Sequence, residues 1–372
     1  MVETVRILVV EDDEDQLEAY RDAAEEKNTN GCHIELVERE SAPKAKEELL
    51  SKGFDGAIVD LNLSPGNPDE ASGNEILLEI TQKHRFPVLV VSGNLQNLDP
   101  SIQESGFLKT YNRDIPNDEI FDYLLKIHAT GITRILGGRG LVERHLGKIF
   151  WHHLACDIDS WDAGNRESEQ TLLRYTVAHL AEYLDIPDAN NDGHYHEAEF
   201  YIIPPIRGHI ATGDILQYED KKYIVLSPPC DVAVRGENVG RPIINAKSIV
   251  LAPLIPLHRT SFVQEGLIHE GGGSDNAKGV KKLLEELIKG KREKYVFLPG
   301  YREIDPAVAD LQNLCTWPLD KYLSAKRTAT VSGAFLKDIQ SRFASYYGRQ
   351  GQPDLNKQEL LKKYKSKLTS SS

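Results

Sequence analysis

Acidic residues directly follow two apolar segments in the first part of the chain. Residues 7–10 are Ile-Leu-Val-Val, and an acidic run at residues 11–13 comes next. Residues 56–59 are Gly-Ala-Ile-Val, and Asp60 comes next. Short continuous apolar runs are typical of strands buried on both faces of a parallel sheet, whose carboxyl ends lie at one edge. The sequence therefore predicts that carboxylates from both strand ends share one pocket.

Such a pocket is electrostatically costly unless a cation enters it. Two unit charges about 4 Å apart repel by about 4 kcal/mol at an effective dielectric constant near 20. Carboxylate oxygens are the hard ligands that Mg²⁺ prefers, so we expect a magnesium site. The alternative is that Asp12 and Asp13 only cap the helix that follows, because acidic side chains are favoured at helix N-termini.

Two further apolar segments end in side chains that can bind a phosphoryl group. Residues 87–91 precede Ser92, whose hydroxyl can donate a hydrogen bond. Residues 106–108 precede Lys109, whose ammonium can pair with phosphoryl oxygens. The acidic run, Asp60, Ser92 and Lys109 thus follow successive strands in a fixed order, which is more specific than any one of them alone.

With these residues, about residues 4–128 resemble the receiver domain of bacterial two-component response regulators. The resemblance implies an α/β, flavodoxin-like, doubly wound (βα)5 fold with a parallel sheet. It implies that Asp60 is the phosphoacceptor and that a histidine kinase or phosphotransfer protein is the phosphoryl donor. It further implies that Asp12, Asp13 and Asp60 hold Mg²⁺ together with the backbone carbonyl of Asn62.

The same resemblance assigns roles around the phosphoryl group. Ser92 and Lys109 complete the catalytic set, and Ser92 with the aromatic Phe107 would form the switch that senses phosphorylation. Asn62 and Asn94 stand where the family tunes water access, and their small polar side chains predict a transient phosphorylated state.

The receiver-like segment departs from the family pattern in length. The loop at residues 61–72 is about five residues longer than usual and contains two prolines and a glycine, which predicts an irregular flap. The stretch from Ser92 to Lys109 is about five residues shorter than usual, so the fourth helix should be reduced or missing. The aromatic residue is displaced to Phe107, and strand alternation predicts that it points inward.

A helical connector is predicted at residues 131–190, after a receiver domain at residues 1–130. Residues 141–155 and 167–184 carry apolar side chains at helical spacing. The glycine-rich residues 130–140 are expected to form a hinge. Helices in this position can transmit the state of a receiver or pair with a second copy, so a homodimer is one expectation.

Residues 191–372 are predicted to form an α+β output domain of unknown type. Short apolar segments separated by turn residues predict a small antiparallel β-barrel or sheet, and residues 275–368 are expected to be helical. Residues 213–216, Gly-Asp-Ile-Leu, faintly resemble the small-barrel endoribonuclease toxins of toxin–antitoxin pairs, but the basic and hydroxyl residues of those enzymes find no clear match. The predicted strands are residues 202–206, 213–218, 222–226 and 248–254, and the predicted helices are residues 276–290 and 333–347.

Several polar groups in the rest of the chain were weighed as sites. A set of histidines and acids could bind zinc, but its spacing matches neither a zinc finger nor HExxH. Cys230 is expected on a structural turn. Residues 271–274 lack the Gly-Lys-Ser/Thr of a P-loop, so a flexible loop is expected there. A set of Arg and Tyr residues is expected to consist of core aromatics beside exposed arginines rather than to form a nucleic-acid surface. The zinc set is His152, His153, Cys156, His194, His196, Glu197 and Glu199, and the Arg and Tyr set is Arg342, Tyr346, Tyr347 and Arg349.

Charge is divided unevenly along the chain. Residues 1–130 contain 12 Lys and Arg against 27 Asp and Glu, whereas residues 326–372 contain 10 against 3. The basic segment can contact phosphate backbones or the acidic receiver, but a solvated helix end is the simpler interpretation, and nucleic-acid binding stays open.

The sequence predicts a cytoplasmic protein without a membrane span. No apolar stretch approaches 18 residues, and the start of the chain lacks signal-peptide character. The four widely spaced cysteines fit reduced thiols.

These features together predict a response regulator with an output domain that is not a helix-turn-helix module, since no such motif is recognisable. Two alternatives stay open: a receiver-controlled enzyme such as a nuclease, or a phosphorylation-dependent adaptor in a stress or phage-defence system. The sequence does not identify the kinase, the output or the oligomeric state.

Overall fold

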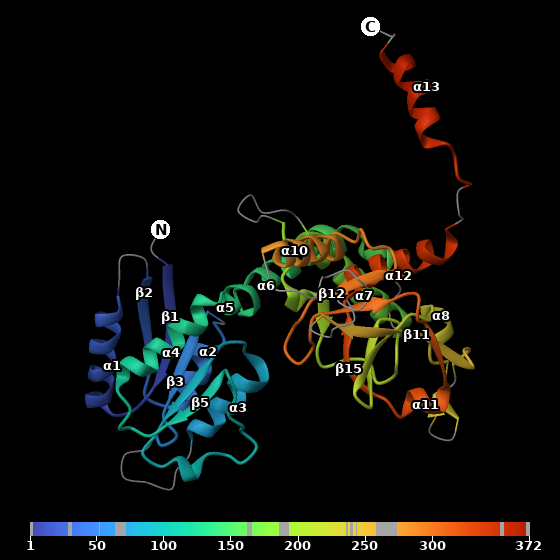
Figure 1. Cartoon of the computed structure of the whole chain (residues 1–372). Coiled ribbons are helices and arrows are strands. Elements are labelled where there is room, and N and C mark those ends of the chain that lie inside the picture. The colour runs from blue at the N-terminus through green and yellow to red at the C-terminus, as the bar shows by residue number, and fades with distance from the viewer. Residues whose placement is uncertain are drawn as a thin grey trace. The chain divides into compact units, whose positions relative to one another are not determined.

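The computed structural model divides the chain into two compact units, Met1–Asp188 and Ala189–Ser372 (Figure 1). The residues that the structure describes are 3–28, 32–51, 53–63, 72–161, 166–185, 193–235, 237–238, 241–242, 244–257, 274–349 and 353–369.

The first unit is built on a five-stranded parallel sheet with the strand order β2-β1-β3-β4-β5. This is the flavodoxin-like order of a doubly wound sheet, so the predicted fold is confirmed. The strands β3 and β4 and the last four residues of β1 are continuous buried apolar runs, as expected for strands covered by helices on both faces of the sheet. The strands are β1 (Glu3–Val10), β2 (Cys32–Arg39), β3 (Gly56–Val59), β4 (Val88–Val91) and β5 (Leu108–Tyr111).

Two helices pack on each face of this sheet (Figure 1). α1 (Glu14–Lys27) and α4 (Asn117–Ala129) lie on one face, where the ring edge of Tyr20 meets Phe121 with centroids 6.4 Å apart. α2 (Ala42–Leu49) and α3 (Gly73–Lys83) cover the other face. Successive residues of β1 alternate between the two cores, so the strand contributes to both.

The predicted loss of the fourth receiver helix is confirmed. Between β4 and β5 the chain forms a single 3₁₀ turn, Leu95–Asn97. The Asn74 side chain of α3 holds this segment in place: its Nδ2 donates to the carbonyl of Asn97 at 2.8 Å, and its Oδ1 accepts from the amide of Asp99 at 3.0 Å. A side chain of the preceding helix thus fixes the segment that a longer helix would otherwise occupy.

The segment after α4 is helical but interrupted. α6 (Leu141–Lys148) runs into a π-helical turn, Ile149–Leu154, and a 3₁₀ stretch, Ala155–Ser160, before α7 (Arg166–Leu184). Two helices are therefore present where two were expected, although the first is broken by a change of helix type.

The expected hinge at residues 130–140 instead contains a short helix, α5 (Ile132–Leu136). Its Arg134 pairs with Glu3 of β1, and the carbonyl of Leu136 accepts a hydrogen bond from Arg85. Gly131 ends α4 with a φ of 80°, a left-handed conformation that glycine adopts without strain. The glycines here serve a tight turn onto the receiver sheet rather than a free linker.

The second unit contains an eight-stranded antiparallel sheet, as expected from the sequence. The hydrogen-bonded path is β12-β13-β11-β8-β7-β15-β6, and β14 pairs with β11. Across the two ends of this path, the hydroxyl of Tyr201 in β6 donates to the carbonyl of Pro299, 2.6 Å away and just beyond β12. The strands are β6 (Tyr201–Ile202), β7 (Asp214–Tyr218), β8 (Lys221–Val225), β11 (Ser248–Pro256), β12 (Tyr295–Leu298), β13 (Ala307–Asp310), β14 (Cys315–Pro318) and β15 (Lys326–Val331).

The expectation that residues 275–368 are helical is wrong in part, since four of these strands lie within them. The apolar runs of β12 and β13 are short and largely buried, and periodicity alone does not separate such runs from buried helix. The remaining elements are the helices α8 (Pro229–Val232), α10 (Ser274–Ile288), α11 (Leu319–Leu323), α12 (Gly333–Gly348) and α13 (Lys357–Thr369), a 3₁₀ turn (Glu197–Phe200), and the two-stranded ladder of β9 (Glu237–Asn238) and β10 (Arg241–Pro242). Among the described residues, every helix is too short or too polar to span a membrane.

Candidate functional site

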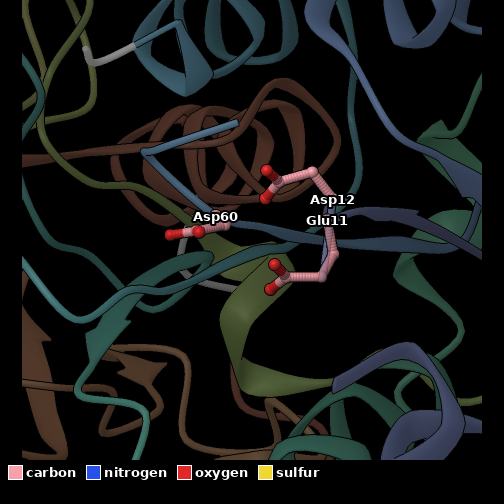
Figure 2. A group of neighbouring side chains, drawn as sticks. All are labelled: Glu11, Asp12 and Asp60. Atoms are coloured by element: carbon pink, nitrogen blue, oxygen red, sulfur yellow. The ribbon is translucent and has the colours of Figure 1, made fainter. Parts of the chain in front are cut away.

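Three carboxylates meet at the carboxyl edge of the parallel sheet. Glu11 and Asp12 follow β1, and Asp60 follows β3. The two strands pair in register from Ile7 opposite Gly56 to Val10 opposite Val59, and the amide of Asp60 donates to the carbonyl of Val10 at 2.9 Å. One oxygen of each carboxylate lies within 4.8 Å of the others, and Figure 2 shows the three groups gathered around one space. The predicted pocket between the two strand ends is therefore present.

The structure places Glu11 in this cluster, where the sequence analysis placed Asp13. The strand ladder continues one residue beyond β1, because the amide of Glu11 donates to the carbonyl of Arg39 at 3.1 Å. Glu11 is buried. Asp13 is instead the N-cap of α1, with its Oδ1 accepting from the amide of Asp15 at 3.0 Å. The helix-capping alternative thus holds for Asp13 but not for Asp12.

Arg113 supplies the positive charge at the cluster. Its Nη2 lies 2.6 Å from Oδ2 of Asp60 and 2.8 Å from Oε1 of Glu11, and its Nη1 lies 3.4 Å from Oδ2 of Asp13. The Arg113 side chain is 34% exposed, and it comes from the turn between β5 and α4. The sequence analysis did not select this residue. The available signal was that Arg113 is the next cation along the chain after Lys109.

Lys109 does not lie at the edge of the sheet where the sequence analysis placed it. In the strand register, Lys109 is opposite Leu89, and Leu89 is opposite Ile58, two residues before Asp60. Strand β5 continues past Lys109 to Tyr111. The apolar run at residues 106–108 predicted the strand end too early, because the polar residues that follow still pair with β4.

Phe107 lies at the opposite edge of the sheet from the carboxylates. Its carbonyl accepts from the amide of Val88 at the start of β4, at 2.8 Å. Its side chain is 48% exposed and lines an apolar pocket of about 330 Å³ with Phe86 and Ile132 among its walls. The predicted switch role of Phe107 is therefore not supported by its position, and the aromatic residue level with the end of β4 is Tyr111, opposite Val91.

Ser92 lies directly beyond β4 and is 1% exposed. Its amide donates to the carbonyl of Tyr111 at 3.1 Å, and its Oγ accepts a long hydrogen bond of 3.5 Å from the amide of Asn94. Asn62 lies two residues beyond Asp60 and is partly buried. Residues 64–71 of the predicted flap lie outside the described part of the chain.

Burial and repulsion between carboxylates shift Glu11 and Asp12 toward their neutral forms. Burial, and then the charge of Asp60, raise the pKa of Glu11 to about 7, against an opposing effect of Arg113. Burial also raises the pKa of Asp12. Oδ1 of Asp60 is buried and has no hydrogen-bond partner among the described residues. A buried acceptor left unpaired costs about 1–3 kcal/mol, so this atom is suited to a ligand that the protein does not itself provide.

Removal of the Glu11 charge should change how stability depends on pH. The pKa of Glu11 rises from 4.5 in the unfolded chain to about 7 in the fold, so the folded state binds more protons between these values. Stability of the metal-free protein should therefore fall as the pH rises from 4.5 to 7, by about 3 kcal/mol from this group. Urea unfolding of wild type and Glu11→Gln at pH 5 and pH 8 measures this difference. Equal pH dependence of stability in the two proteins would show that the pKa of Glu11 is not raised in the fold. Saturating Mg²⁺ should reduce the loss of stability at high pH in the wild type.

The other weighed groups form no comparable cluster. Within the described part of the chain, Glu11, Asp12 and Asp60 are the one set of three His, Cys, Asp or Glu residues close enough to hold a metal ion. His196 caps the 3₁₀ turn Glu197–Phe200, and Cys230 is an exposed free thiol at the start of the short helix α8. The residues 271–273 of the weighed glycine loop lie outside the described residues.

The Arg and Tyr residues of α12 and its end are engaged within the second unit. Arg342 pairs with Asp338 at 2.7 Å, and Arg349 pairs with Glu293 at 2.5 Å and lies over the ring of Tyr346. The Tyr347 hydroxyl donates to the carbonyl of Leu311 at 2.7 Å. Tyr346 is partly buried against the core of the second unit, as expected, whereas Tyr347 is 54% exposed, so the expectation of core aromatics holds for Tyr346 and is wrong for Tyr347.

The chain is similar to solved structures but matches no model of a sequence family. No family model matches the chain, and no curated protein matches it. Solved structures that it resembles include a CheY-like response regulator receiver domain from Methylobacillus flagellatus, with 19% identity over 34% of this chain and 99% of that chain and a TM-score of 0.26. They also include the response regulator protein TrrA from Thermotoga maritima in complex with Mg(2+)-BeF, with 23% identity over 33% of this chain and 98% of that chain and a TM-score of 0.26. These two matches each cover about a third of the chain, at its N-terminal end, where the parallel sheet with the strand order β2-β1-β3-β4-β5 lies.

Proposed function

We propose that the first unit is a Mg²⁺-dependent phosphoreceiver that accepts a phosphoryl group on Asp60. The observation that carries this proposal is the buried, unpaired Oδ1 of Asp60 within a cluster of three carboxylates at the end of a parallel sheet. Glu11, Asp12 and Asp60 have the oxygen donors that Mg²⁺ requires, and the backbone carbonyl of Asn62 is a further candidate ligand. When bound, Mg²⁺ would neutralise charge on the cluster and on the phosphoryl oxygens.

The protein has to supply little of the chemistry of the phosphoryl transfer. An oxygen of the Asp60 carboxylate forms a bond to phosphorus while the phosphorus–nitrogen bond of a phosphohistidine breaks, and the imidazole nitrogen keeps the electron pair of that bond. The chain's contribution is to hold the carboxylate in line and to bind the equatorial oxygens. The hydroxyl of Ser92, at the end of the neighbouring strand, is placed to donate to one of them.

The donor proposed for this reaction is a histidine kinase or a phosphotransfer protein, and the site of action is the cytoplasm. Asn62 and Asn94 present small polar groups beside the acceptor and beside Ser92, which should let water reach the phosphorylated state. We propose a transient phosphorylated state whose output lies in the helices after α4 or in the second unit, by way of a shift between two receiver states.

Acetyl phosphate tests this proposal without knowledge of the kinase. The full chain should gain one phosphoryl group with acetyl phosphate and Mg²⁺, and none when EDTA replaces the metal. Intact-mass spectrometry measures the addition, and borohydride reduction of the acyl phosphate before peptide mapping locates it. Labelling that persists in EDTA, or that maps away from Asp60, would refute the proposal.

A further inference from the structure

The cation at the acceptor carboxylate is an arginine from the turn after β5. Arg113 contacts Asp60 and Glu11 at 2.6 and 2.8 Å through a single nitrogen, Nη2. Both partners are almost fully buried, with side chains 2% exposed, whereas the guanidinium is reachable from solvent. The arginine therefore enters the pocket from outside and closes over the acids.

We propose that Arg113 is the site's own counter-cation, which competes with the divalent cation for the carboxylates and then pairs with the phosphoryl group on Asp60. This inference rests on the proposed function and gives a specific role to a residue at that site. It assigns to Arg113 both the resting neutralisation of the cluster and the recognition of the phosphorylated state. It assigns neither to Lys109.

The strand register places the backbone of Lys109 short of the site, whereas Arg113 makes the contacts with the acids in the state described. Lys109 is level with Ile58, so it lies two residues short of the sheet edge at which Asp60 emerges. Thr110, the residue after it, is held to Glu104 by two hydrogen bonds of 2.7 and 2.8 Å, which fix this part of β5. Arg113 lies beyond the end of β5, in a turn whose backbone is free of strand pairing.

Competition follows from shared carboxylate groups. Arg113 binds Oδ2 of Asp60 and Oε1 of Glu11, and a metal ion held by all three carboxylates draws on the same charges. The positive charge of the guanidinium also repels an incoming divalent cation at this distance. Oδ1 of Asp60 is left without a partner, so the arginine satisfies only half of the acceptor carboxylate.

The guanidinium is also suited to the product. A planar fork of donors binds two oxygens of a phosphoryl group at once, which a lysine ammonium does not do with the same geometry. A phosphoryl group on Asp60 would be attached to the carboxylate that Nη2 already contacts. A small rotation of a solvent-accessible side chain is enough to move the contact from carboxylate to phosphoryl oxygens.

The experiment measures Mg²⁺ affinity and beryllofluoride affinity separately on the full chain. Isothermal titration calorimetry with Mg²⁺ should show tighter binding for Arg113→Gln than for wild type, by about tenfold at low salt, because a competing charge is gone. In saturating Mg²⁺, ¹⁹F NMR titration with beryllofluoride, which mimics the phosphoryl group, should show about tenfold weaker binding for Arg113→Gln. Lys109→Gln is the matched control and should change both affinities less than about twofold.

Arg113→Lys keeps the proposal testable if the neutral variant fails to fold. It retains the charge but loses the fork, so Mg²⁺ affinity should stay near the wild-type value while beryllofluoride binding weakens. Unchanged affinities in both Arg113 variants, or a loss of beryllofluoride binding in Lys109→Gln, would overturn the inference and leave the phosphoreceiver function intact. A wild-type chain that binds no Mg²⁺ would instead refute the proposed function, and the inference with it.

Discussion

Replacement of Asp60 by Asn is expected to abolish phosphorylation by acetyl phosphate, with at least a 100-fold loss of labelling rate. An amide oxygen is not a competent nucleophile toward phosphorus, and the substitution also removes the charge that a divalent cation would bind. The fold should survive, because Asn has nearly the same shape and because the change relieves repulsion with Glu11. Phosphoprotein mass and circular dichroism, measured on the same samples, separate loss of chemistry from loss of structure.

A set of acidic variants tests which carboxylates belong to the site. Glu11→Gln and Asp12→Asn should each reduce Mg²⁺ affinity by about tenfold or more, because each removes a charge from the three-carboxylate cluster. Asp13→Asn is the control: Asn is as good an N-cap as Asp, so both α1 and the labelling rate should be preserved. A loss of Mg²⁺ binding in Asp13→Asn with none in Glu11→Gln would restore the assignment made from sequence alone.

The parallel sheet and the position of Asp60 at the end of β3 were predictable because the signal was in continuous apolar runs. Strands β1, β3 and β4 are buried on both faces and are followed at once by polar groups, so the ends of these strands could be located from the sequence. Asp60 and Ser92 are therefore found where they were predicted. The shortened segment between β4 and β5 was also predictable, since it is a matter of chain length.

The cation and the aromatic switch were misplaced because β5 is an edge strand. Its outer residues face solvent on one side, so Thr110 and Tyr111 belong to the strand although they do not extend the apolar run. A strand end read from hydrophobicity alone falls at Leu108, which shifts every later assignment along the strand. That early end put Lys109 at the edge of the sheet, whereas Phe107 was proposed as the displaced aromatic residue of the family pattern. Arg113 lies beyond both, after the true end of β5.

The second unit was predictable only in its architecture. Turn residues between short apolar runs indicated an antiparallel sheet, and β7, β8 and β11 lie close to their predicted ranges. β14 pairs with β11, which lies more than 60 residues earlier in the chain. Such long-range pairing leaves no local trace in the sequence, so β14 was taken for helix.

Gly73 holds the acceptor loop against α3, and its replacement should have the largest structural effect among single changes near the site. A Cβ atom at this position would lie 2.1 Å from the carbonyl oxygen of Asp60 and 2.7 Å from the Cα of Leu61. Both are backbone atoms, so no side-chain rotation can relieve the clash. The amide of Gly73 also donates to the carbonyl of Leu61 at 3.0 Å, which fixes the close approach. Gly73→Ala should therefore destabilise the first unit by about 3 kcal/mol or more.

The expected loss of stability is opposite in sign to the usual result, because Gly→Ala within a helix ordinarily stabilises by up to about 1 kcal/mol. The two outcomes are therefore easy to distinguish. Gly147 of α6 is the matched control: nothing lies within 4 Å of the Cβ it would gain, so Gly147→Ala should stabilise slightly. Hydrogen exchange of peptides from β3 and α3 in the full chain measures the local effect, and protection there should fall in Gly73→Ala and not in Gly147→Ala. Because the clash involves the carbonyl of the acceptor itself, the exchange should be accompanied by loss of labelling at Asp60. Undiminished protection together with normal labelling would mean that α3 can withdraw from the acceptor loop without cost, and that the close approach at Gly73 does not position Asp60.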